Sequence, residues 1–403
     1  MQQNPEKIFQ TELTSELNNI LNYWINFSVD KVNGGFIGKR DHFNNEVSRA
    51  SKGIVLNTRI LWTFSAIGNY NQNKKLLPFA EKAYNYLKNY FKDEKFQGIY
   101  WELDAYGVPL NKRKQIYAQA FGIYALSEYY LLTKDENAKN WALSLFSLIE
   151  DHARDKDANG YLEAFQEDWS PIADMRLSEK DKNAAKTMNT HLHLLEAYTS
   201  LFQIAGNENL KIKEALENLV YLFLEKFLDK SNQHFQLFFD KNWERSGNVV
   251  SYGHDIEAIW LLIEAAKALK NENLIEKTRE AAVSVAQVFL DQAYVKNAGV
   301  LNEKDLDSGK VDTDRHWWPQ AEAMVGLDYA FKISGEDKFR EAKIDIWEFI
   351  KKHIKDHENG EWFFRIDKNN IPYKNEDKLG MWKGPYHNSR ACLILLNLDK
   401  QGS

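Results

Sequence analysis

The sequence predicts an all-α fold, a single (α/α)6 barrel in which six helical hairpins close into a ring with short β-hairpin connections at one mouth. Three observations predict it. Only 7 of the 403 residues are proline, about 1.7% against a usual ~5%, so few helix breakers interrupt the chain. Two markers, a short aromatic element and a helix start, each recur six times. The last inner helix, 391–398, is as apolar as the middle ones, whereas an open array of repeats needs polar caps.

Each repeat contains the two markers in the same order, at intervals of 60 to 74 residues. The short elements are Gly35-Phe36, Gly98–Trp101, Gly160-Tyr161, His234-Phe235, Gly299-Val300 and Gly360–Trp362. The helix starts that follow contain Arg59, Gln119, His193, His254, Gln320 and His387. Outer helices are predicted at 138–152, 210–227, 274–290 and 338–354, where apolar side chains recur at helical spacing. We expect residues 1–403 to form one domain.

Composition excludes several classes of protein. The chain has 58 acidic and 52 basic side chains, a net charge of −6, and lacks the basic stripe of a nucleic-acid-binding protein. Its one cysteine, Cys392, excludes a disulfide framework and a cysteine-rich zinc site. No stretch approaches the roughly 20 apolar residues of a membrane span, and the start carries no readable secretory signal. We therefore expect a cytoplasmic protein without nucleic-acid or membrane partners, as a monomer or weak homodimer.

Polar side chains mark the starts of the predicted inner helices. These helices run parallel in such a barrel, so their N-terminal residues converge at one end of the axis. The residues expected there are Arg59, Gln119, His193, His254, Glu257, Gln320, Glu322, His387 and Arg390. Histidine titrates near neutrality, which suits removal and return of a proton next to a carbonyl group. Glu257 stands three residues after His254, so we expect its carboxylate to support that ring. His191, two residues from His193, is expected to pack instead.

Three other functions compete with proton transfer. A histidine and a glutamate three apart on two helices could bind metal, but the Glu-x-x-His order of di-iron bundles is reversed and Arg59 adds a cation. We therefore expect no metal, and the absence of a Gly-x-Gly-x-x-Gly loop predicts no nucleotide cofactor. Glu257 and Glu322 could be the carboxylate pair of a glycosidase, which the neighbouring histidines fit poorly. A glycan-binding barrel without activity is the non-enzymatic alternative.

Aromatic residues accompany the polar cluster: Tyr117, Trp317, Trp318, Trp382 and Tyr386. Trp317 and Trp382 are predicted to stack on sugar rings from the rim of the barrel, because indole faces suit carbohydrate. The polar segment 177–186 makes the longest connection, and is either a lid or a solvated loop.

With these residues assembled, the chain resembles the N-acylglucosamine 2-epimerase superfamily over essentially its whole length. The resemblance is carried by Met188–Tyr198, by Ser251–Ala258 and by Trp382–Asn388. It implies the (α/α)6 fold and catalysis without metal or nucleotide on unmodified sugars. The motifs are similar to those of the branch that epimerises the reducing-end glucose of β-1,4-linked disaccharides such as cellobiose and lactose. Epimerisation or isomerisation of free mannose is the alternative.

The resemblance also implies a role for each site residue. His254 and His387 would be the acid/base pair, which removes the C2 proton to give a cis-enediol and returns a proton on the other face. Glu257 would hold His254, while Arg59 and His193 would stabilise O1 or the enediolate. The implied substrate-binding residues are Tyr117, Asn189, Trp317, Trp318, Trp382 and Glu322, with Trp382 near the reducing end and Trp317 on the second glucose.

Overall fold

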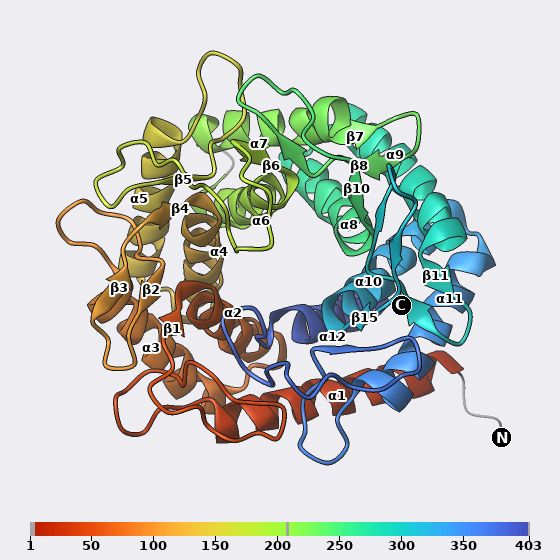
Figure 1. The fold of residues 1–403 in the computed structure, drawn as a ribbon, viewed down its shortest axis with the longest axis horizontal. Helices are drawn as coiled ribbons and strands as arrows, with labels where there is room; N and C mark the ends of the chain where they lie inside the picture. Colours follow the sequence, from red (N-terminus) through yellow and green to blue (C-terminus); the bar gives the residue numbers. More distant parts are fainter. Residues whose placement is uncertain (1–4, 207–208, 402–403) are drawn as a thin grey trace.

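The predicted barrel is confirmed by a computed structural model that describes residues 5–206 and 209–401. Helices form two concentric layers around one axis (Figure 1). The inner layer contains α2 (Ile54–Asn71), α4 (Ile116–Thr133), α6 (Met188–Ala205), α8 (Tyr252–Leu269), α10 (Trp317–Ser334) and α12 (Tyr386–Gln401). The outer layer contains α1 (Pro5–Phe27), α3 (Leu77–Tyr86), α5 (Glu136–His152), α7 (Leu210–Leu222), α9 (Glu272–Gln292) and α11 (Asp337–Phe349). A 3-10 turn, η1 (Lys74–Leu76), leads into α3, and π-helical turns extend α3, α7 and α11 as η2 (Leu87–Phe91), η3 (Phe223–Phe227) and η4 (Ile350–Ile354).

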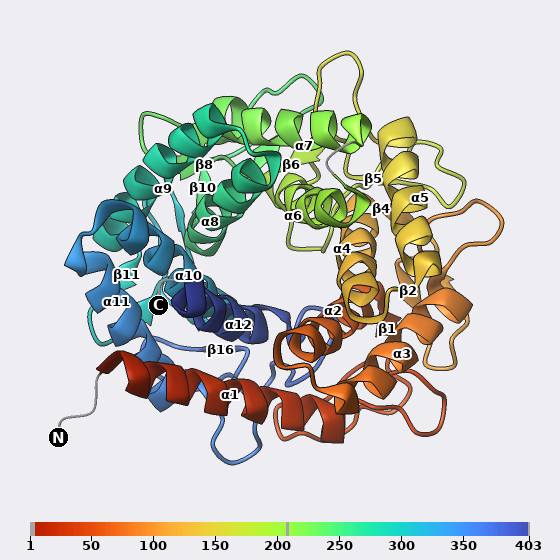
Figure 2. The ribbon, with the colours of Figure 1, turned by 180° about the vertical axis from the view of Figure 1, so that it is seen from behind.

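The N-terminal helix closes the ring. In the view from behind, α1 runs along the outside of α12 and fills the outer position between α11 and α3 (Figure 2). Its tryptophan Trp24 donates to Glu361, and Trp362 donates to Glu16 of α1. An isolated β-bridge between Arg40 and Leu379 joins the first and last repeats. None of the helices in the described residues combines the length and apolarity needed to cross a membrane.

Short antiparallel strands connect neighbouring repeats at the N-terminal ends of the inner helices. A strand leads directly into five of these helices and pairs with a strand further along the chain, giving β1–β2, β4–β5, β6–β9, β10–β13 and β15–β16. The strands are β1 (Lys52–Gly53), β2 (Glu102–Leu103), β3 (Pro109–Asn111), β4 (Lys114–Gln115), β5 (Ala164–Phe165), β6 (Lys186–Thr187), β7 (Leu228–Asp229), β8 (His234–Phe235), β9 (Phe238–Phe239), β10 (Val249–Ser251), β11 (Tyr294–Val295), β12 (Gly299–Val300), β13 (Glu303–Asp305), β14 (Val311–Asp312), β15 (Arg315–His316) and β16 (Arg365–Ile366).

The recurring aromatic element folds back on the end of each outer helix. Its residues pair with the chain just after that helix, as in the bridges Lys92↔Ile99 and Arg154↔Tyr161 and the β7–β8 and β11–β12 ladders. Gly160 has φ +80°, and a Cβ there would lie 2.5 Å from the Trp243 ring. The turn therefore requires glycine, because both the backbone region and the space exclude a side chain.

A side chain three residues after the start of an inner helix fixes this element in four repeats. Gln119 accepts from the backbone N–H of Ile99 (2.9 Å) and donates to its carbonyl (2.8 Å), and Gln320 does the same at Val300. His191 accepts from the N–H of Tyr161, and Asp255 from that of Phe235. We call Gln119, His191, Asp255 and Gln320 the anchor residues. The expectation that Gln119 and Gln320 belong to the polar cluster is wrong, because they face the hairpins.

Buried lysine–aspartate pairs, which were not predicted, hold the recurring turn in four of the six repeats. The pairs are Asp30–Lys52 (2.8 Å), Asp93–Lys114 (2.6 Å), Asp155–Lys186 (2.9 Å) and Asp356–Lys378 (2.5 Å). Each aspartate also accepts backbone N–H groups two and three residues later. The repeated aspartate, four or five residues before the glycine, could have revealed this arrangement.

Candidate active site

Four polar residues from four inner helices meet at one depth in the barrel. Arg59, His193, Glu257 and Glu322 each stand five residues after the first residue of their helix. Because the helices start at the same mouth, equal offsets give equal depths along the axis. Anchor residues stand two positions earlier, about 200° around the helix, and so point the other way. With His254, His387, Glu196 and Arg390, these four residues form what we call the histidine cluster.

His387, the second residue of α12, is held by a carboxylate from α10. Its Nδ1 lies 2.6 Å from Glu322 Oε1. The side chain is buried, and burial together with the charges of Arg59 and Arg390 holds its pKa well below 6.5. The ring is therefore neutral at pH 7 and able to accept a proton. Glu322 also accepts from Arg390 and Trp260, so it supports His387 rather than facing substrate, contrary to its predicted role.

His254, in the first turn of α8, is held by a hydroxyl group. Its Nδ1 lies 2.7 Å from Ser251 Oγ, three residues earlier. Burial and the nearby His193 lower its pKa to about 3. The expected support from Glu257 is wrong for this structure, because Glu257 Oε1 accepts from Arg390 Nη2 at 2.5 Å. A serine three residues before the histidine was the available sequence signal for the true partner.

His193 pairs with a carboxylate on its own helix. Its Nδ1 lies 3.0 Å from Glu196 Oε2, one helical turn further on. The ring contacts Tyr117 edge-on at 4.9 Å between centroids. Arg59 donates to the Tyr117 hydroxyl at 2.9 Å. Arg59 and His193, both predicted to stabilise O1 of a sugar, thus meet at Tyr117, a predicted substrate-binding residue.

Trp318 lies against both candidate acid/base rings. Its centroid is 4.8 Å from that of His254 and 5.5 Å from that of His387. Four residues of the predicted site are partly exposed: Asn189, His254, Trp318 and Trp382. The Oδ1 atom of Asn189 lacks a hydrogen-bond partner among the described residues, and Trp382 contacts Tyr117. Trp317 is 1% exposed, with Lys383 over its ring and His387 at its edge. Its predicted stacking on a sugar is therefore wrong, because no face is open.

Arg390 stands at the centre of the cluster's charges. It donates to Glu196, Glu257 and Glu322. Burial and the Glu322 charge raise the pKa of Glu257 to about 7, whereas Arg390 helps to hold the pKa of Glu196 at about 2 against the effect of burial. Glu257, Glu322 and His387 have ligand-type atoms within 4.8 Å of one another. The guanidinium already contacts both carboxylates, at 2.5 and 2.7 Å, so a metal ion would compete with it.

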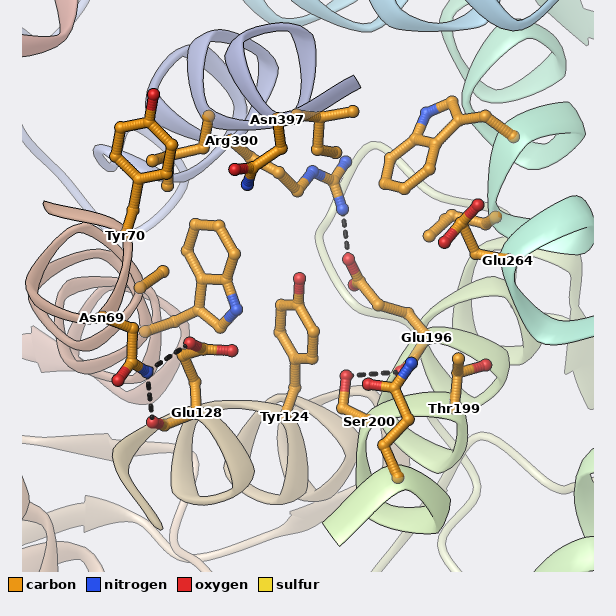
Figure 3. Close-up of a pocket in the computed structure, with 17 residues that line it drawn as sticks. Asn69, Tyr70, Tyr124, Glu128, Glu196, Thr199, Ser200, Glu264, Arg390 and Asn397 are labelled. Carbon is orange, nitrogen blue, oxygen red and sulfur yellow. Dashed lines mark hydrogen bonds and ion pairs between the residues drawn. The ribbon is translucent and has the colours of Figure 1, made fainter. Parts of the chain in front are cut away.

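A cavity of about 520 Å³ lies on the other side of this network, where it is lined by later turns of the inner helices (Figure 3). We call it the rear cavity. On α8 it contacts Trp260 and Glu264, about 9 and 15 Å beyond His254 along the helix axis. Glu196 and Arg390 line it as well, and Figure 3 shows them joined across it. These two side chains therefore belong both to the wall of the rear cavity and to the histidine cluster.

The segment 177–186 is hydrogen-bonded within itself and to its base. Ser178 donates to Asp181, and Asn183 accepts from the N–H of Met175. Lys186 ends the segment in the buried pair with Asp155. Whether the segment moves as a lid stays a prediction.

Comparisons with known proteins identify a class of enzyme. The model of the N-acylglucosamine 2-epimerase family matches residues 35–391. A cellobiose 2-epimerase of Bacteroides fragilis is 44% identical, over 97% of this chain and 99% of its own length. The solved structure of cellobiose 2-epimerase from Bacillus thermoamylovorans superposes with a TM-score of 0.93 at 37% identity, covering 97% of this chain and 100% of that one. A solved D-mannose isomerase has a TM-score of 0.83 at 21% identity and shares the fold.

The barrel and these relatives define a carbohydrate epimerase, an enzyme of the isomerase class. The chain belongs to the N-acylglucosamine 2-epimerase family.

Proposed function

We propose that the protein interconverts glucose and mannose at the reducing end of β-1,4-linked disaccharides such as cellobiose and lactose. The observation that carries the proposal is the pair of histidines, His254 and His387, on one indole ring, Trp318. Both have lowered pKa values and are neutral at pH 7. Two neutral imidazoles around one site can each accept or return a proton, as inversion at a carbon next to a carbonyl requires.

The proposed reaction starts from the open-chain aldehyde form of the sugar. One histidine removes the proton from C2, and the C2–H electron pair forms the C1–C2 double bond of a cis-enediolate while O1 takes the negative charge. After rotation about C2–C3, the other histidine gives a proton to the opposite face of C2, and the carbonyl group forms again. Arg59 supplies the positive charge that stabilises O1, and His193, which meets Arg59 at Tyr117, offers its Nε2 as a hydrogen-bond acceptor for a hydroxyl group of the enediolate.

The disaccharide preference rests on the relatives and on aromatic surface. Five relatives between 36 and 44% identical are cellobiose 2-epimerases. Trp382 is partly exposed and lies 6.1 Å from Trp101 and 6.0 Å from Tyr117, between ring centroids. The indole of Trp382, backed by these two buried rings, offers a stacking surface beside the cluster. Action on free mannose is the second candidate, favoured by a D-mannose isomerase of Marinomonas mediterranea that is 24% identical over 85% of this chain.

The test is incubation with cellobiose, lactose, mannose and N-acetylglucosamine in D2O, in matched samples with and without EDTA. We expect each disaccharide to be converted as fast with EDTA as without it. NMR should then show deuterium at C2 of the new mannose residue. Some ketose is expected, since the same enediol can be protonated at C1. Conversion of mannose alone would support the second candidate. Protium retained at C2 in the product would contradict exchange through the histidines, and loss of activity in EDTA would contradict a metal-free reaction.

A further inference from the structure

Glu196 belongs to the histidine cluster but has no role in the proposed reaction. Its carboxylate is buried between two helices and is divided between two sets of donors. Oε2 lies 3.0 Å from His193 Nδ1 on the same helix, α6. Oε1 accepts from the Tyr386 hydroxyl and from Arg390 Nη1, both on α12. One side chain therefore connects a histidine of the cluster to the opposite side of the barrel.

The geometry determines which nitrogen of His193 carries hydrogen. Because Tyr386 and Arg390 donate to Glu196 and Arg390 adds positive charge, the carboxylate is anionic, and its pKa is about 2. An anionic carboxylate only accepts hydrogen bonds, so Nδ1 of His193 must be the donor. Glu257 differs in this respect, because it does not hold a ring and its Oε2 lacks a partner among the described residues.

We propose that Glu196 is a positioning residue, which keeps His193 protonated at Nδ1 and fixes the ring so that Nε2 faces the substrate side of the cluster. The role of His193 in turnover rests on the proposed function, whereas the state of its ring does not. Tyr386 and Arg390 in turn hold Glu196 in place. Glu196 also lines the rear cavity.

Replacing Glu196 by glutamine gives a specific expectation. Tyr386 and Arg390 both need an acceptor where Oε1 stands, so the amide oxygen is expected to take that position. The amide NH2 group then occupies the position of Oε2 and points at Nδ1 of His193. A donor there requires an acceptor, so hydrogen should move from Nδ1 to Nε2. A carboxylate that fixes a histidine tautomer in this way contributes strongly to rate in the serine proteases.

The first measurement is NMR of the full-length protein labelled with 15N-histidine, without substrate. The His193→Asn variant assigns the His193 signals. We expect the wild type to have hydrogen on Nδ1 of His193, and Glu196→Gln to have it on Nε2. A wild-type ring with hydrogen on Nε2 only, or a variant with an unchanged tautomer, would overturn the proposal. This result is independent of turnover, so it holds even if no disaccharide is epimerised.

The second measurement is the kinetics of the same variants, with Glu128→Gln as the matched control. Glu128 also lines the rear cavity, on the neighbouring inner helix α4, and its hydrogen-bond donor is Asn69 at 2.8 Å (Figure 3). We expect Glu196→Gln to lower kcat by about 10²-fold or more with little change in KM, and Glu128→Gln to keep both values. Adding Glu196→Gln to His193→Asn should cause no further loss. An additional loss in the double variant, with the helical circular dichroism unchanged, would show that Glu196 does not act through His193.

Discussion

His191 and His193 are two residues apart on α6 and have opposite functions. His191 is an anchor residue: Nε2 accepts from the backbone of Tyr161, and Nδ1 lies 2.7 Å from the Thr187 carbonyl. His193 belongs to the histidine cluster, where its partner is the side chain of Glu196. The two positions point about 200° apart around the helix. In α6, α8 and α10, one turn of the helix thus carries both an anchor residue, which fixes the scaffold, and a residue of the histidine cluster.

The two sets also differ in charge. The anchor residues bond mainly to backbone groups of one hairpin, and two of the four are uncharged glutamines. The cluster bonds side chain to side chain across α6, α8, α10 and α12, with three carboxylates on one guanidinium. Substitutions in the first set should change stability, and substitutions in the second should change rate.

The largest effect is expected for the acid/base pair. His254→Ala and His387→Ala should each lower kcat by about 10²–10⁴-fold, because each removes a positioned proton carrier. Neither ring anchors a hairpin, so helical circular dichroism and the urea midpoint should stay close to those of the wild type. Activity on cellobiose and urea unfolding measure the two expectations. Near-normal turnover in either folded variant would remove that histidine from the mechanism.

The next effect falls on the scaffold. Lys114→Met removes the cation from its ion pair with Asp93, in which both side chains are fully buried. Breaking such a pair costs about 3–5 kcal/mol, because a buried charge is left without a partner. Urea unfolding should show this loss, while the kcat of the folded fraction stays unchanged. Lys112→Met is the matched control, because Lys112 pairs with Glu167 on the surface, and such pairs contribute about 1 kcal/mol or less. Similar losses in the two variants would contradict the role assigned to burial.

A smaller effect separates the two carboxylates Glu257 and Glu322, whose partners in the structure differ from the predicted ones. Glu322 contacts His387, whereas Glu257 lies 4.0 Å from it and bonds to Arg390. Glu322→Gln should therefore lower kcat by about 10–100-fold, since outer partners of a functional histidine have effects of that size. Glu257→Gln should lower it less. The steady-state kinetics of both variants on cellobiose decide this, and a larger loss in Glu257→Gln would restore the original assignment.

Helix periodicity and repeat spacing were sufficient to predict the barrel, because six similar intervals leave few ways to bury six apolar faces. They also placed Arg59, His193, His254 and His387 at one end, since equal offsets along parallel helices give equal depths. The partners were predicted less well. Glu257 and His254 share a helix face, but the strongest donor within reach of Glu257 is Arg390, from a helix 133 residues away in sequence. Local spacing cannot rank a neighbour on the same helix against one across the barrel. The prediction that Trp317 stacks on a sugar was wrong for a related reason, because Lys383, from another part of the chain, covers its ring.

The smallest effect is expected for His191→Gln, which exchanges one anchor residue for the type found at two equivalent positions. Gln320 accepts from the N–H of Val300 and donates to the carbonyl of His316, four residues before Gln320. His191 makes the equivalent contacts with the N–H of Tyr161 and the carbonyl of Thr187. Activity should be unchanged, and the free energy of unfolding at pH 7.5 should change by about 1.5 kcal/mol or less.

The variant should differ from the wild type in acid. Burial lowers the pKa of His191 to about 3 in the folded protein, against 6.5 for the free side chain. Between these values the unfolded chain binds a proton that the folded protein does not, so the wild type loses stability as the pH falls from 6.5 towards 3. Glutamine does not titrate, so the free energy of unfolding of the variant should fall by about 1.4 kcal/mol less than that of the wild type between pH 7.5 and 5.5. Urea unfolding at pH 7.5 and 5.5 measures the difference, and equal losses in both proteins would show that His191 accepts a proton in the folded state.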